Sequence, residues 1–155
     1  RGIIGEHHFR SHAWVLLSDA AGSGQTAVLQ WLHDSFDLGS AAFIDAPMIR
    51  TASSSGHLLA LMYISENFQI GVKHVRNASN GALSSAILGG HLSVVQFLVS
   101  KFELTAEDAI EAIPRQFSSD ALKYSRFPIT CLTWIIDRFS IPLVSLPPVL
   151  VQLIS

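Results

Sequence analysis

Histidine is the residue type in this sequence best suited to chemistry, because its imidazole ring binds metals and exchanges protons near neutral pH. Three histidines lie close together near the start of the chain, at His7, His8 and His12, with Glu6 beside them. His8 and His12 are spaced to share one face of a helix. The segment has no HExxH spacing and no nearby cysteine, so we predict no metal site there. We interpret residues 1–13 as a polar N-terminal cap or the tail of a preceding repeat.

Two further histidines each follow a glycine, in the pairs Gly56-His57 and Gly90-His91. As bases or ligands they would need a serine, cysteine or carboxylate partner, and neither has one at a position that repeats. We therefore predict no catalytic, cofactor-binding or metal-binding residue. The chain is not expected to be an enzyme.

Residues 14–26 could form a different kind of site. Residues 14–17 are a plausible buried strand, and A-G-S-G-Q-T and an apolar helix follow. This order resembles the phosphate loop of nucleotide hydrolases, G-x-x-x-x-G-K-[ST]. Asp19 stands where the first glycine belongs, however, and Gln25 replaces the lysine that reaches the phosphates. A nucleotide-binding remnant with a decayed phosphate loop at residues 19–26 is kept as an alternative.

The helices predicted around these residues recur along the chain as similar pairs. Residues 81–104 predict two short helices separated by Gly89-Gly90, with an apolar stripe at helical spacing on each. Aligned on the second helix, four apolar columns keep step across four units, and we expect the aromatic first column to pack in the core. The columns are Trp31, Tyr63, Phe97 and Trp134; Leu32, Ile64, Leu98 and Ile135; Phe36, Phe68, Phe102 and Phe139; and Leu38, Ile70, Leu104 and Ile141.

The third unit resembles an ankyrin repeat, because residues 90–95 read G-H-L-S-V-V against that family's G-H-L-x-V-V. The second unit has Gly56-His57-Leu58, the first has Gly24 at the turn, and the fourth is degenerate. The resemblance implies an all-α fold, an ankyrin-like solenoid of about four degenerate helix-turn-helix repeats with short or irregular fingers. It also implies that the rings of His57 and His91 form hydrogen bonds between neighbouring turns.

The whole chain, residues 1–155, is predicted to be a single repeat domain from a longer array. Its approximate units are 14–46, 47–79, 80–114 and 115–141, and residues 142–155 are the start of a further repeat or a C-terminal cap. Residues 37–47 and 69–80 are expected to be finger-like loops, with a tight turn at Asn80-Gly81. Thr105 is expected to cap a helix that Pro114 ends.

Composition limits the classes of function. Hydrophobic residues make up 49% of the 155, and charged residues only 14%, so the two end faces are expected to be interfaces. The net charge of −2 without a basic patch argues against nucleic acid. No segment predicts a membrane span or a signal peptide. The single cysteine, Cys131, is expected to be buried, and it favours a reducing, cytoplasmic (intracellular) location.

The function implied by the resemblance is protein–protein interaction. As a scaffold, the chain would bind another protein, of identity not specified by the sequence, on its concave loop and first-helix face, and would contact neighbouring repeats. No cofactor is expected. A structural spacer within a multidomain protein is a further alternative. The residues predicted to face the partner are Asp19, Ser23, Arg50, Ser54, Ser84 and Ser85.

Overall fold

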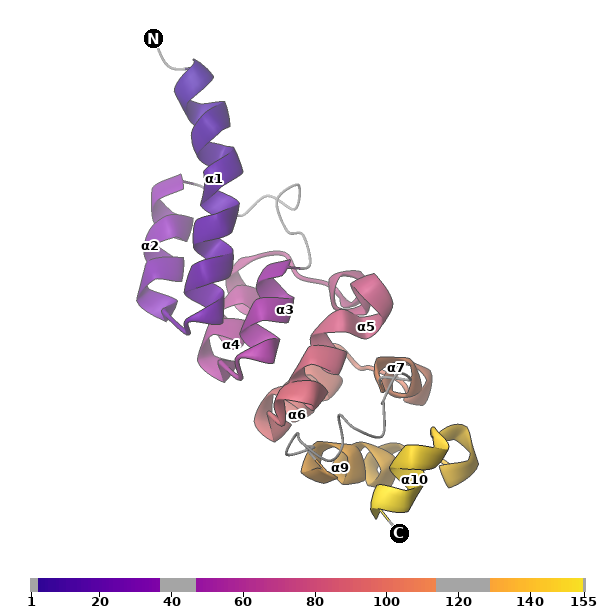
Figure 1. Cartoon of the computed structure of the whole chain (residues 1–155). Helices are drawn as coiled ribbons and strands as arrows, with labels where there is room; N and C mark the ends of the chain where they lie inside the picture. Colours follow the sequence, from indigo (N-terminus) through magenta and orange to yellow (C-terminus); the bar gives the residue numbers. More distant parts are fainter. Residues whose placement is uncertain (1–2, 37–46, 114–128, 155) are drawn as a thin grey trace.

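Every regular element in the described part of the chain is a helix, as Figure 1 shows for the computed structural model. The structure describes residues 3–36, 47–113 and 129–154. The prediction of an all-α fold is therefore confirmed over these ranges. The helices, in chain order, are α1 (Ile3–Gly22), α2 (Thr26–Phe36), α3 (Pro47–Ser54), α4 (Leu58–Asn67), α5 (Val72–Gly89), α6 (Leu92–Lys101), α7 (Ala106–Ala112), α9 (Ile129–Phe139), the short 3-10 helix η2 (Leu143–Ser145) and α10 (Pro148–Ile154).

The helices form two rows that run side by side (Figure 1). One row is α1, α3, α5 and α7, and the other is α2, α4, α6 and α9, with each helix packed on the next of its row. Within the first three pairs, the two helices are antiparallel neighbours joined by a short glycine turn. The helix α10 packs on α9 at the C-terminal end. The helix predicted between Thr105 and Pro114 is present as α7, and it continues the row of first helices.

The apolar columns predicted from spacing form much of the core. Leu32, Ile64, Leu98 and Ile135 are all buried, and so are Phe68, Phe102, Leu104 and Ile141. Cys131 is buried, as predicted. The side chains of Phe36 and Leu38 lie outside the described part of the chain.

The aromatic column departs from its prediction. Tyr63, Phe97 and Trp134 are partly buried against the core, but Trp31 is 59% exposed. The prediction that Trp31 packs in the core was therefore wrong. The reason lies in its position. Trp31 is on α2, the first helix of its row, whereas Tyr63, Phe97 and Trp134 are on α4, α6 and α9, each of which packs on a preceding helix of that row.

The strand expected at residues 14–17 is part of the helix α1. Ala13, Leu17, Ala20 and Ala21 are buried at helical spacing, which lets α1 pack along α3. The apolar residues 14–17 therefore belong to a helix and not to a buried strand, and the helix buries Leu17 while it exposes Val15 and Leu16. The helix also extends ahead of the predicted unit boundary at residue 14, through most of the segment interpreted as a cap.

The tight turn expected at Asn80-Gly81 is also wrong, since both residues lie inside α5. This helix replaces most of the finger-like loop expected at residues 69–80. Val75, Ala82, Leu83, Ala86 and Ile87 bury one face of α5 between α3 and α7. Tertiary packing outweighs the cost of about 1 kcal/mol for a glycine inside a helix. Of the loop predicted at residues 37–47, only Pro47 is described, and it begins α3. Pro114, which was expected to end a helix, lies outside the described ranges.

Candidate functional site

The same turn joins the helices of the first three pairs. Gly24, Gly56 and Gly90 all have left-handed backbones, with φ of 68°, 75° and 73°. The residue after each glycine donates its backbone N–H to a carbonyl five residues back, at 2.8–3.0 Å. A left-handed residue of this kind closes a helix, and glycine adopts that conformation without steric cost. The turns are therefore built alike.

The histidines that follow two of these glycines pack on the preceding turn. A β-carbon added to Gly24 would lie 2.6 Å from Nδ1 of His57, and one added to Gly56 would lie 2.7 Å from Cγ of His91. The Nε2 atom of His91 also lies 3.0 Å from the carbonyl oxygen of Ser54. Because a carbonyl only accepts, Nε2 carries the proton and donates it. The predicted bond between neighbouring turns is confirmed for His91, and the ring of His57 makes the matching contact with Gly24.

The stretch that resembles a phosphate loop has its backbone donors in use. Ser23, Gly24, Gln25 and Thr26 donate their N–H groups to carbonyl oxygens of Asp19, Ala21, Ala20 and Gly24, at 2.8–3.2 Å. A phosphate loop instead points such N–H groups at the anion. The helix before the turn also replaces the strand that the motif requires. The geometry of a phosphate-binding loop is absent from residues 14–26.

The six residues predicted to face a partner divide into three groups. Asp19 and Ser23 are exposed and line one groove between α1 and α2. Arg50 and Ser54 are exposed one helical turn apart on α3. Ser84 and Ser85 are half-buried on α5. The hydroxyl of Ser54 donates to the Thr51 carbonyl at 3.0 Å, so its side chain is held against its own helix.

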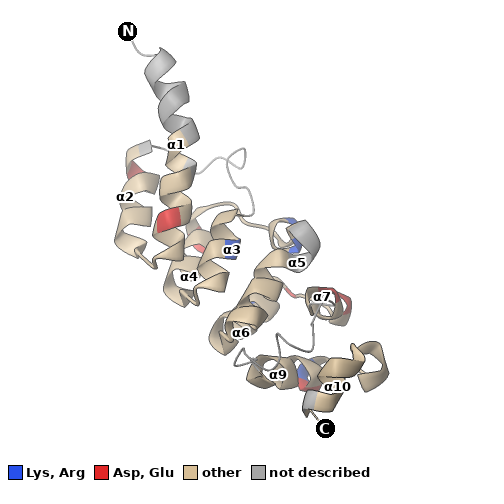
Figure 2. Cartoon of the chain, viewed as in Figure 1, with Lys and Arg blue, Asp and Glu red and all other residues tan. Residues whose placement is uncertain are grey.

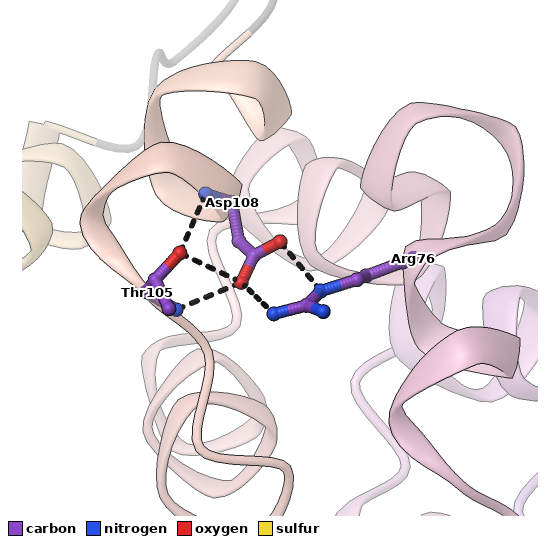
Figure 3. Close-up of polar contacts among 3 residues, drawn as sticks. All are labelled: Arg76, Thr105 and Asp108. Atoms are coloured by element: carbon purple, nitrogen blue, oxygen red, sulfur yellow. Dashed lines mark hydrogen bonds and ion pairs between the residues drawn. The ribbon is translucent and has the colours of Figure 1, made fainter.

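A polar cluster that the sequence reading missed joins α5 to α7 (Figure 3). Arg76 donates from Nε and Nη2 to the two carboxylate oxygens of Asp108, at 2.7 and 2.8 Å. Asp108 also accepts from the backbone N–H and the hydroxyl of Thr105, at 2.8 and 3.0 Å. Thr105 in turn accepts from the Asp108 N–H, so the two residues form a capping box at the start of α7.

The cluster satisfies a carboxylate that is almost removed from solvent. Asp108 is 6% exposed, whereas the Arg76 side chain remains 43% exposed. Burial by itself raises the pKa of Asp108, but the hydrogen bonds from Arg76 and Thr105 and the positive charge of Arg76 outweigh burial and bring the pKa below its usual value. The predicted N-cap at Thr105 is confirmed. The Thr-x-x-Asp spacing signalled the cap, but the partner at Arg76 could not be read without knowing that α5 is a helix at that point.

The described ranges offer few other side chains for metal binding or catalysis. They contain no group of three or more His, Cys, Asp or Glu side chains placed to hold a metal ion. The side chains of Glu6, His7 and His8 lie outside the described part, and His12 is exposed. The thiol of Cys131 is buried, and burial raises its pKa. Charged side chains are few and scattered over the helices (Figure 2), which leaves the surface mostly uncharged.

None of the helices in residues 3–36, 47–113 and 129–154 combines the length and the apolar content needed to cross a bilayer.

Comparison of the chain with protein-family models, curated proteins and solved structures gave no match.

Proposed function

We propose that this chain is a divergent ankyrin-like helical solenoid that binds another protein on the concave face formed by its first helices and turns. The single observation that carries the proposal is the repeated turn. Gly24 and Gly56 each receive the histidine ring of the next pair, which stacks the pairs in a fixed register. Stacked pairs of this kind present one extended surface.

The first helices supply the binding surface in this proposal. Arg50 lies six residues before Gly56, and Ser84 lies six residues before Gly90, so the two residues occupy equivalent positions on α3 and α5. Arg50 and Ser54 are exposed, and Ser84 is half-buried. The small side chains leave room for a partner to approach closely, and Arg50 supplies a planar cation with several donors. A protein segment that offers backbone carbonyls and one carboxylate fits this surface.

The experiment is site-specific photo-cross-linking in an extract of the source cells. A photoreactive residue at Arg50 is expected to yield a discrete cross-linked protein, and the same residue at Lys101 is the control, because Lys101 is exposed at the end of the second-row helix α6. Ser84→Arg, which fills the surface beside Arg50, is expected to abolish the product.

Absence of any product specific to Arg50 would count against partner binding on this face and favour the alternative of a structural spacer. Equal products from Arg50 and Lys101 would show a non-specific surface. Nothing in the geometry favours the nucleotide-binding alternative, since the N–H groups of the turn at Ser23, Gly24, Gln25 and Thr26 are already bonded within the protein.

A further inference from the structure

An apolar groove lies between α1 and α2 at the N-terminal end of the two rows. We call it the upstream face. Three of its apolar side chains are exposed to solvent: Leu16 by 45%, Val28 by 37% and Trp31 by 59%. Its lining residues are Leu16, Asp19, Ala20, Ser23, Gln25, Val28, Trp31 and Leu32.

The later pairs show what such positions contact. Counted back from the turn glycine, Leu16 is equivalent to Met48 and Ala82, and these two are 1% and 4% exposed. In the second row, Val28 is equivalent to Ala60 and Val94, which are both completely buried. The same positions therefore change from exposed to buried wherever another helical pair lies ahead of them.

The polar residues of the upstream face are likewise equivalent to residues that contact the preceding pair in the later pairs. Asp19 is equivalent to Thr51, whose hydroxyl donates to the Ser18 carbonyl of the preceding pair at 3.3 Å. Gln25 is equivalent to His57 and His91, whose rings pack on the turn glycine of the preceding pair. The upstream face thus consists of the positions that, in the next two pairs, form the contact with the pair before them.

We propose that the upstream face docks a further helix-turn-helix pair of the same kind, joined to the start of α1 in the same polypeptide. The occupant presents apolar side chains to Leu16, Val28 and Trp31. It places a left-handed glycine over the side chain of Gln25. The carbonyl two residues before that glycine, like that of Ser54 in the second pair, accepts a hydrogen bond from the Gln25 amide.

The arrangement of α5 explains why one polypeptide can supply this occupant. The helix α4 ends at Asn67, and the long helix α5 begins at Val72 after a short link. The helix α1 is similarly long, with 20 residues against 18 in α5, so a preceding pair can reach it through a similar link. A second copy docked head to tail fits less well, because α10 already covers α9 at the other end and buries Leu146 and Leu150. The inference is independent of the partner surface at Arg50.

The experiment adds such a pair and measures the burial of the face. Residues 47–71 are duplicated and joined directly ahead of Glu6, because Glu6 precedes Gly24 by as many residues as Val72 precedes Gly90. Val28→Cys is introduced into the parent and the extended chain, and its labelling by a thiol reagent is timed. Native Cys131 is buried and reports any unfolding. Ser100→Cys, exposed on α6, is the matched control.

The expected result is rapid labelling at residue 28 in the parent and labelling at least about tenfold slower in the extended chain, the size of effect that a shift of about 1.4 kcal/mol toward the docked state gives. Ser100→Cys should label equally in both chains. Leu16→Asp should restore rapid labelling in the extended chain while leaving the parent's stability unchanged.

Three results would overturn the proposal. One is equal labelling of Val28→Cys in both chains. Another is a failure of the added segment to increase the helical circular dichroism signal, because that segment needs the face to bury its own apolar side. The third is slow labelling in a parent that light scattering shows to be a dimer, since a second copy would then cover the face.

Discussion

Substituting alanine for Gly56 tests the contact that sets the spacing of the helical pairs. An alanine in the left-handed conformation costs about 1–2 kcal/mol. The new β-carbon would lie only 2.7 Å from Cγ of His91, so the ring has to move. Moving it breaks the bond from His91 Nε2 to the Ser54 carbonyl, which contributes about 0.5–1.5 kcal/mol. We therefore expect Gly56→Ala to lower the free energy of unfolding by about 1.5–3.5 kcal/mol.

A matched control is available at Gly22, the last residue of α1. A β-carbon there would meet Thr51 Cβ at 3.5 Å, an ordinary contact, and the backbone is not left-handed. Gly22→Ala should therefore leave stability unchanged or raise it by up to about 1 kcal/mol. The assay is urea unfolding followed by circular dichroism, with the midpoint and slope fitted together.

A double-mutant cycle separates strain from steric conflict. In a His91→Ala background the added methyl group has room, so Gly56→Ala should cost only the left-handed strain of about 1–2 kcal/mol. The reasoning is refuted if Gly56→Ala costs the same with and without the His91 ring, or if it unfolds within about 0.5 kcal/mol of the parent.

Three further predictions concern the core, the polar cluster and the thiol. Leu98→Ala should cost about 2–5 kcal/mol in the same urea titration, because Leu98 is completely buried, whereas Arg50→Ala on the exposed side of α3 should stay within about 0.5 kcal/mol of the parent; a reversed order would contradict the assigned core. Asp108→Asn should destabilise the protein at neutral pH by about 1.5–3 kcal/mol. Since the pKa of Asp108 is lowered by folding, this difference should be fully present above the unfolded pKa of about 3.9 and be lost as the pH falls through the folded value, and a difference that grows with acid would exclude the assigned partners. Cys131 should react with a thiol reagent only in concentrated urea, and rapid labelling of the native protein would show that α9 is not packed as described.

Spacing alone predicted the second row of helices well. Leu32, Ile64, Leu98 and Ile135 were found from a single rule, an apolar residue at the same place in each second helix, and all four are buried. The rule works because these side chains point into the space between the two rows, where every pair buries them regardless of its neighbours. The cap at Thr105 was equally predictable, since its bonds join residues three apart in the sequence.

The lengths of the first helices could not be predicted in the same way. Asn80-Gly81 is a strong turn signal locally, but the buried face of α5 continues across it because α3 and α7 pack on both sides. The pairing of Arg76 with Asp108 depends on this extension, since Arg76 lies in the part of α5 that was expected to be a loop. An error in one helix boundary thus concealed a contact between residues 32 apart in the sequence.

Trp31 shows a different limit of periodic patterns. Its column predicts an aromatic residue packed in the core, and Tyr63 and Phe97 are partly buried against the core. Trp31 has the same place on its helix, yet it is exposed, as are Val28 and Leu16 beside it. A repeat therefore specifies which faces are suited to contact, but not whether a neighbour is present at each end of the series. Val28 is apolar and exposed, whereas the equivalent Ala60 and Val94 are apolar and buried. The first pair therefore carries a surface suited to contact, and a pair of the same kind is the occupant that we propose.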